Sequence, residues 1–150
     1  HFEKLADALF WYNFAQVVAS LLMLKMARFW VGKRSMIILM AVLSIVGTSG
    51  TIVLEGWPAI FSATLMSFVA GILLILLVAL PPLLVRSEET GRLSAGTFLV
   101  GYTLAFSIPM IGGLIADWSG DIRHAIMVMV GYSLLVLPIA FTLDLRRRPA

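Results

Sequence analysis

The hydrophobic residues of this chain form long windows that contain no Asp, Glu, Lys or Arg. Four of these windows cover residues 35–54, 59–85, 93–116 and 125–143. A helix of about 20 residues, rising about 1.5 Å per residue, spans the roughly 30 Å hydrocarbon core of a bilayer. Each window is long enough for such a helix, so the pattern predicts four membrane-spanning segments.

A fifth window, from Ala8 to Leu24, is shorter and carries Asn13, Gln16 and Ser20. We expect it to form a spanning helix that is partly polar. One Asp, Lys or Arg at a helix centre costs about 2.5–3.5 kcal/mol on insertion scales, and all five windows avoid that cost. The expected fold class is an all-α membrane protein. Its five transmembrane helices form one partial bundle, at about 6–25, 35–54, 59–85, 93–116 and 124–144.

Composition supports a lipid environment for this chain. Apolar residues make up 61% of it and charged residues 13%, against about 45–50% and about 25% in soluble domains. A soluble fold of this size has too little interior to bury so much apolar surface. The expected partner is therefore the lipid bilayer. The net charge of +3 is explained by membrane topology, and no nucleic-acid partner is expected.

The basic residues sort onto alternate loops. Nine fall in the first loop, the third loop and the carboxyl tail: Lys25, Arg28, Lys33, Arg34, Arg86, Arg92, Arg146, Arg147 and Arg148. Only Lys4 and Arg123 fall on the other side. Basic residues in short loops mark the cytoplasmic side. We therefore expect a multi-pass protein of the plasma membrane, with its carboxyl terminus in the cytoplasm and its amino end outside.

An amino end outside the membrane requires a segment that directs it there, such as a signal peptide or a preceding helix. The first window has neither a basic leader nor an A-x-A cleavage site, so no signal peptide is visible. The hypothesis that follows is that the chain is a fragment and that at least one helix precedes His1.

Polar residues inside the windows are the candidate binding groups, because such groups usually face the interior of a bundle. Asn13 and Gln16 lie three residues apart, on one face of the first helix. Amides carry more donors and acceptors than hydroxyls, which often bond to their own helix. We expect Asn13, Gln16 and Tyr102 to line a polar cavity and bind substrate. No charged residue lies near a helix centre, and no metal, cofactor or proton relay is expected in these windows.

Small residues and prolines predict where helices pack closely or bend. Ala59, Ala63, Ser67 and Gly71 repeat at intervals of four, which is typical of a close helix contact or of a face that slides. Pro109, followed by Gly112 and Gly113, predicts a bend in the fourth helix, which would serve a static kink or a gate equally well.

A minor alternative is an intramembrane serine protease. The segment GTSG matches a G-x-S-G pattern in which Ser49 would be the nucleophile, and His124 lies on the same expected side as a base. His124 lacks the A-H-x-x-G context of that class. The chain is therefore not expected to be an enzyme.

Three segments together resemble the carboxy-terminal half of a major facilitator superfamily transporter. LFWYNFAQVVASLL resembles the eighth helix of the branch that contains cyanate and nitroimidazole transporters. PPLLVRSEETGRLSAGTFLVGY resembles the connection between the tenth and eleventh helices. IPMIGGLIADWSGDIRHA resembles the outer end of the eleventh helix, with its P-x-x-G-G-x-x-x-D-x-x-G pattern. One departure is the first loop, which has no acidic residue ahead of Lys33 and Arg34.

The resemblance implies a secondary active transporter that works by alternating access. Its helices would be the eighth to twelfth of that fold. Its first, third and fourth helices would line the central cavity, and its second and fifth would face lipid. It further implies a small polar solute or organic anion as substrate, a missing amino-terminal bundle as partner, and the bacterial inner membrane as location. A membrane subunit that does not transport remains the alternative.

Overall fold

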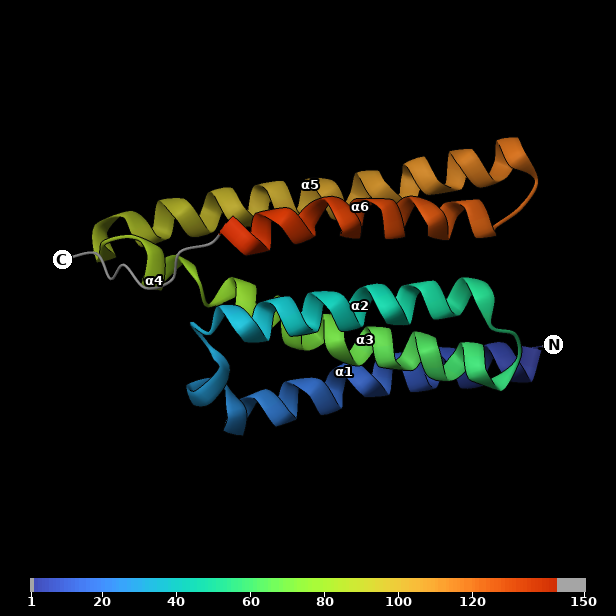
Figure 1. Ribbon diagram of the computed structural model, residues 1–150, viewed down its shortest axis with the longest axis horizontal. Helices are drawn as coiled ribbons and strands as arrows, with labels where there is room; N and C mark the ends of the chain where they lie inside the picture. The colour runs from blue at the N-terminus through green and yellow to red at the C-terminus, as the bar shows by residue number, and fades with distance from the viewer. Residues whose placement is uncertain (1, 143–150) are drawn as a thin grey trace.

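The computed structural model describes residues 2–142, and all of the regular structure in this range is helical (Figure 1). The helices are α1 Phe2–Trp30, α2 Arg34–Val53, α3 Trp57–Val78, α4 Pro81–Leu84, α5 Ser87–Ser119 and α6 Arg123–Thr142. The all-α expectation is therefore confirmed for this part of the chain. The basic residues of the carboxyl tail, Arg146 to Arg148, lie outside the described residues.

Within the described range, four helical segments are long and apolar enough to cross a membrane: Ala6–Trp30, Arg34–Val53, Trp57–Val78 and Ser87–Ser119. The chain is thus a multi-pass membrane protein by length and composition. α6 is a helix of 20 residues, and its passage through the bilayer stays a prediction.

The third expected helix is shorter than its hydrophobic window. We expected one helix over residues 59–85, but α3 ends at Val78 and the short helix α4 begins at Pro81. Proline lacks a backbone N–H, and its ring disfavours helical geometry in the residue before it. Pro81 and Pro82 therefore occupy the first turn of a new helix, where a missing N–H costs nothing. The window is apolar on both sides of this break, so hydrophobicity alone did not predict it.

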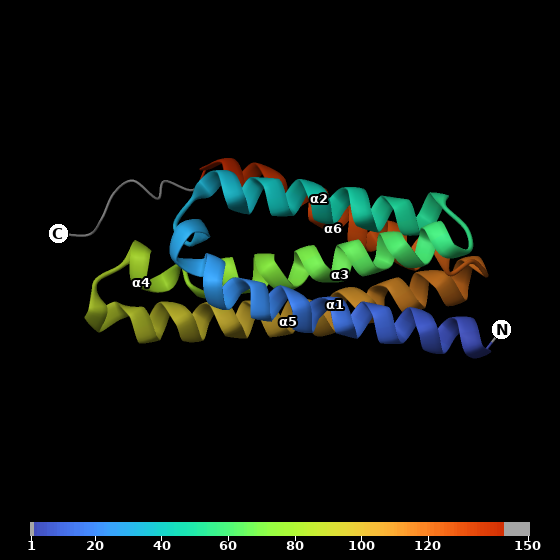
Figure 2. The ribbon, with the colours of Figure 1, turned by 90° about the horizontal axis from the view of Figure 1, so that it is seen from below.

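The five long helices form an open arc. Contacts join α1 to α3, α3 to α2, α2 to α6 and α6 to α5 in that order. Figures 1 and 2 show α1 and α5 at the two ends of this arc, with α3, α2 and α6 between them. Neighbours in the arc are therefore not always neighbours in sequence, and α2 provides the contact between the α1–α3 part and the α5–α6 part.

The core lies where α1, α2 and α3 meet. It contains Ala19, Met23, Ile37, Met40, Val69, Ile72, Leu76 and Leu80. Elsewhere large apolar side chains point away from the protein: Leu99 is 72% exposed and Phe106 is 82% exposed. Such extensive apolar exposure fits a hydrocarbon environment and would be costly in water.

Small residues bring α3 close to both of its neighbours. Ser67 is fully buried and its hydroxyl donates to the carbonyl of Tyr12 in α1 at 2.7 Å. A Cβ at Gly71 would lie 3.3 Å from the Cβ of Ala19. The expected contact role is therefore confirmed for Ser67 and Gly71, because these two positions touch α1 directly.

Charged residues separate between the two ends of the bundle. The basic end has Lys25, Arg28, Lys33, Arg34, Arg86 and Arg92, with Glu88 and Glu89, and a net charge of +4 from these residues. The acidic end has Asp7, Glu55, Asp117 and Asp121, with Arg123, and a net charge of −3 from these residues. The sorting of loop charges inferred from sequence thus corresponds to two opposite ends of the structure.

One polar link joins the two parts of the arc at each end. At the acidic end, Arg123 pairs with Glu55 at 3.1 Å, and both side chains are exposed. At the basic end, Arg34 donates to the carbonyl of Phe141 in the last turn of α6. A cation there also complements the negative end of the helix dipole.

The turn between α5 and α6 combines a glycine and an aspartate. Gly120 adopts a left-handed conformation, with φ of 72°, that side chains rarely accept. The carboxylate of Asp121 then accepts a hydrogen bond from the backbone N–H of Arg123 at 2.8 Å. That N–H has no partner within the helix, so Asp121 acts as the amino-terminal cap of α6.

Replacing Asp121 with alanine should lower the free energy of unfolding by about 1 kcal/mol, because the cap is lost. Thermal unfolding of the detergent-purified protein measures this. Asp121→Asn keeps the acceptor and should retain most of the stability, whereas equal losses in both variants would contradict a capping role.

Candidate functional site

A cavity of 330 Å³ opens between the two parts of the arc, and all five long helices line it. Its lining residues are Tyr12, Ser44, Thr48, Met66, Ala70, Leu104, Ala105, Ile108, Pro109, Met129, Tyr132 and Ser133. Three hydroxyl groups come from serine and threonine and two from tyrosine. We define these twelve residues as the central cavity.

Close packing of α2 against α3 forms one wall of the central cavity. A Cβ at Gly47 would lie 3.0 Å from the Cβ and 3.1 Å from the Cα of Met66. Ser62 in α3 also donates to the carbonyl of Gly47 at 3.1 Å. These contacts fix Met66 beside Thr48, so the wall has little freedom to separate.

The opposite wall contains a proline inside α5. Pro109 cannot donate the usual helical hydrogen bond, so a carbonyl one turn earlier loses that partner. Freed backbone groups are tolerated in spanning helices where they face protein or a polar cavity. The place of Pro109 in the cavity lining fits this requirement.

The hydroxyl groups differ in what they can still bind. Thr48 donates to the carbonyl of Ser44 at 2.8 Å, and Ser133 donates to that of Met129 at 2.9 Å, so their oxygens remain available mainly as acceptors. The phenol hydroxyls of Tyr12 and Tyr132 make no hydrogen bond to any residue that the structure describes. These two phenols are therefore free donors in the central cavity, as is the hydroxyl of Ser44, which makes no hydrogen bond to a described residue.

The central cavity is uncharged along its described lining, since no Asp, Glu, Lys, Arg or His contributes to it. Groups with three or more potential metal-ligating His, Cys, Asp or Glu side chains are likewise absent from residues 2–142. The chemistry offered here is hydrogen bonding by hydroxyl groups within an apolar frame. Such a site suits a small neutral or weakly polar molecule.

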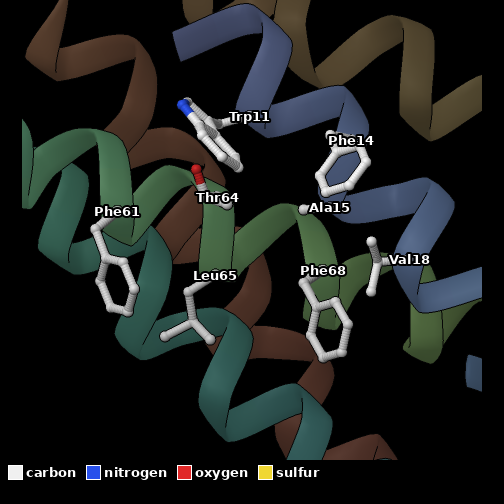
Figure 3. A pocket seen from close by; sticks show the side chains of 8 residues that line it. All are labelled: Trp11, Phe14, Ala15, Val18, Phe61, Thr64, Leu65 and Phe68. Atoms are coloured by element: carbon white, nitrogen blue, oxygen red, sulfur yellow. The ribbon is translucent and has the colours of Figure 1, made fainter. Parts of the chain in front are cut away.

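A second pocket, between α1 and α3, differs in its chemistry (Figure 3). It measures 280 Å³, and its lining is Trp11, Phe14, Ala15, Val18, Phe61, Thr64, Leu65 and Phe68. The hydroxyl of Thr64 donates to the carbonyl of Ile60 in its own helix at 2.8 Å. Aromatic and aliphatic groups therefore dominate this pocket, which suits hydrocarbon better than a polar solute.

The residues expected to bind substrate fall outside the central cavity. Asn13 is exposed, its amide donates to the carbonyl of Leu9 at 2.8 Å, and it lies in a shallow apolar groove along α1. Tyr102 is 70% exposed and stacks on Phe98 with ring centroids 6.1 Å apart. Their substrate-binding role stays a prediction.

Gln16 lies closer to the central cavity than Asn13. It follows Tyr12 by four residues, so the two side chains share one face of α1. Its backbone crosses α3 beside Gly71, where an added Cβ would lie 3.8 Å from the Cα of Gln16. Its side chain is exposed and makes no hydrogen bond within the described part of the chain. Gln16 therefore has free donors and acceptors one turn from a lining tyrosine.

Sequence reasoning missed Tyr12 and Tyr132 as lining residues. The resemblance placed the second and fifth windows against lipid, yet α2 contributes Ser44 and Thr48, and α6 contributes Tyr132 and Ser133. One signal was present for Tyr12, because it lies one turn before Gln16 on the polar face of α1. For Tyr132 the sequence offered no comparable signal. Its position in the lining depends on how α6 packs against the other helices.

The serine protease alternative requires Ser49 next to a histidine base. Ser49 lies in α2 and His124 lies in the first turn of α6. No hydrogen bond joins them among the described residues. The arrangement therefore lacks the contact that would activate the nucleophile.

No protein-family model, curated protein or solved structure matches this chain.

Proposed function

We propose that this chain forms part of a secondary active membrane transporter that carries a small polar solute by alternating access. The observation that supports the proposal most strongly is the central cavity, which five long helices line and which holds two free phenol donors. A membrane protein that only packs against a partner has no need for unpaired hydroxyl groups at this depth, where unsatisfied polar groups are costly.

In this proposal, the five helices correspond to the eighth to twelfth of a major facilitator fold, and α6 crosses the bilayer with the other four. A missing amino-terminal bundle completes the transport path on the exposed faces of α1 and α5. Asn13, Gln16 and Tyr102 would then face that bundle, which agrees with their exposure. An organic anion would draw its positive countercharge from the missing bundle, because the central cavity supplies none.

The proposed orientation follows the charges of the two ends. The basic end, with net charge +4, would lie in the cytoplasm of a bacterial cell, and the acidic end would lie outside. Tyr12 and Thr48 belong to the halves of α1 and α2 nearer the acidic end. The central cavity would therefore open first toward the outer side.

Cysteine accessibility tests whether water and solute reach the central cavity. The sequence contains no cysteine, so Thr48→Cys adds a single thiol to this part of the full-length protein. In proteoliposomes, a charged, water-soluble thiol reagent should label Thr48→Cys and fail to label Phe106→Cys on the exposed apolar face of α5. Equal labelling of both positions, or of neither, would contradict a water-filled cavity.

Transport itself tests the two phenols. Tyr12→Phe and Tyr132→Phe should each slow solute uptake by about two- to tenfold, since one hydrogen bond contributes about 0.5–1.5 kcal/mol. Uptake of a panel of labelled small solutes into proteoliposomes with the full-length protein measures this. Tyr102→Phe and Gln16→Ala test the exposed alternative site in the same assay.

The pattern of losses separates the possibilities. Loss confined to Tyr102→Phe and Gln16→Ala would move the site to the exposed faces of α1 and α5. The absence of flux for every solute tested, in a folded wild-type protein, would favour a membrane subunit that does not transport.

A further inference from the structure

The basic end of the bundle has positive charge that is not paired within the described part of the protein. Among residues 2–142, the carboxylates of this end are Glu88 and Glu89, which lie in the first turn of α5, between Arg86 and Arg92 in sequence. Acids at that position are stabilised by the positive end of the helix dipole. The segment 86–92 is therefore neutral in sum, and the excess charge lies elsewhere at this end.

Arg34 is also engaged within the protein. Its guanidinium donates to the carbonyl of Phe141 and lies 5.8 Å from the centre of that residue's ring. This contact joins α2 to α6 and uses the cation to satisfy the end of a helix. Arg34 is thus a structural residue and does not belong to the free positive charge.

Three basic residues remain, and all lie where α1 turns into α2. Lys25 and Arg28 are three residues apart, so their side chains emerge on one face of α1, with Cβ atoms about 5–6 Å apart. Lys33 directly precedes α2. All three are exposed, and within the described part of the chain none of them pairs with a carboxylate. We define Lys25, Arg28 and Lys33 as the basic triad.

The surroundings of the basic triad place it at the surface of the membrane. Phe29 is 48% exposed and the guanidinium of Arg28 lies 4.5 Å from the centre of its ring. Trp30 is the last residue of α1 and of a membrane-spanning segment. Aromatic side chains at a helix end are typical of the headgroup region of a bilayer.

We propose that the basic triad binds the headgroup phosphate of an anionic phospholipid in the leaflet next to the basic end. The argument is charge complementarity: three exposed cations, which pair with no anion in the described part of the chain, lie at the depth of the lipid phosphates. Arginine and lysine both hold phosphate by charge-assisted hydrogen bonds. The turn that presents Lys33 is fixed, because Gly32 has a φ of 78° and a Cβ there would lie 3.2 Å from Leu83.

This binding is independent of transport, because it requires only that the helices span a bilayer. A local site also differs from a general attraction of anionic lipid to the whole basic end. The segment 86–92 distinguishes the two, since it belongs to the same end and contains two arginines beside two glutamates.

The test compares two double variants of the full-length protein that each remove two positive charges. Lys25→Gln with Arg28→Gln disrupts the triad, and Arg86→Gln with Arg92→Gln is the matched control. Each protein is placed in nanodiscs of phosphatidylcholine, and the binding of spin-labelled phosphatidylglycerol is measured relative to spin-labelled phosphatidylcholine. Nanodiscs present the same lipids to both ends, so a change in membrane orientation does not affect the result.

The triad variant should lose the preference for phosphatidylglycerol by roughly fivefold or more, since each basic residue near an anionic surface contributes about 1 kcal/mol. The control should change by less than about twofold. Lys33 lies between α1 and α2, so Lys33→Gln changes neither helix. This variant should show a smaller loss of the preference for phosphatidylglycerol, and it provides the test if the double variant fails to fold. Equal losses in the triad and control variants, or no loss in any variant, would overturn the proposal.

Discussion

Phe106→Asp should lower membrane insertion of α5 by about 3 kcal/mol, the cost of one aspartate near the centre of a spanning helix. Phe106 lies near the middle of α5 and is 82% exposed. In a soluble protein, a substitution at such an exposed position changes stability by only about 0.5 kcal/mol. The large expected loss therefore follows from lipid around this side chain. An insertion assay with engineered glycosylation sites on either side of α5 measures the effect.

Ile122→Asp is the matched control for this prediction. Ile122 is also a large apolar residue and is 70% exposed, but it lies in the turn between α5 and α6. An aspartate there meets water or lipid headgroups and should leave insertion nearly unchanged. If both variants insert as well as the wild type, the exposed face of α5 is not in hydrocarbon, and the membrane assignment of this helix is wrong.

Gly47→Leu should destabilise the bundle by about 3 kcal/mol, because overpacking a close helix contact forces the backbones apart. The obstacle is the backbone of Met66, whose Cα would lie 3.1 Å from the new Cβ, so no rotation of a side chain relieves it. Separation would also break the hydrogen bond from Ser62 to the carbonyl of Gly47. Unfolding of the detergent-purified protein by heat or by sodium dodecyl sulfate measures the loss.

Gly131→Leu provides the control at a glycine without neighbours. Gly131 lies in α6 and is exposed, and no described atom of another helix lies within 4 Å of an added Cβ. Its replacement should preserve stability or raise it slightly, since glycine is a weak helix former. A similar loss in both variants would mean that helix propensity or insertion, and not the contact with Met66, explains the effect at Gly47.

The sequence predicted the helices well because the thickness of hydrocarbon sets a minimum length for charge-free segments. It predicted their ends less well. α1 continues to Trp30 and α5 begins at Ser87, both beyond the windows, since helical hydrogen bonds continue into the polar interface. The break after Val78 was not predicted, because the hydrophobic window continues through it to Val85. Pro81 and Pro82 were the signal for this break, since proline disfavours the interior of a helix.

The candidate site was harder to predict than the helices. Polarity singled out Asn13, but its amide donates to the carbonyl of Leu9 in its own helix, and its side chain is exposed in a groove that residues of α1 line. Tyr12, its neighbour in sequence, lines the central cavity instead. Adjacent residues on a helix point about 100° apart, so polarity alone does not tell which of the two faces the bundle.

The sequence by itself determined that this chain is helical, that its helices suit a bilayer, and that basic and acidic residues gather at opposite ends. These properties depend on local composition. Whether a segment lies in water or in hydrocarbon is decided by the polarity of that segment alone. Only the tertiary structure decided that α2 joins the two parts of the arc and that α6 supplies Tyr132 to the central cavity. In lipid no hydrophobic force selects one helix neighbour over another, so the order is set by close contacts such as Gly47 with Met66 and by hydrogen bonds such as Ser67 with Tyr12.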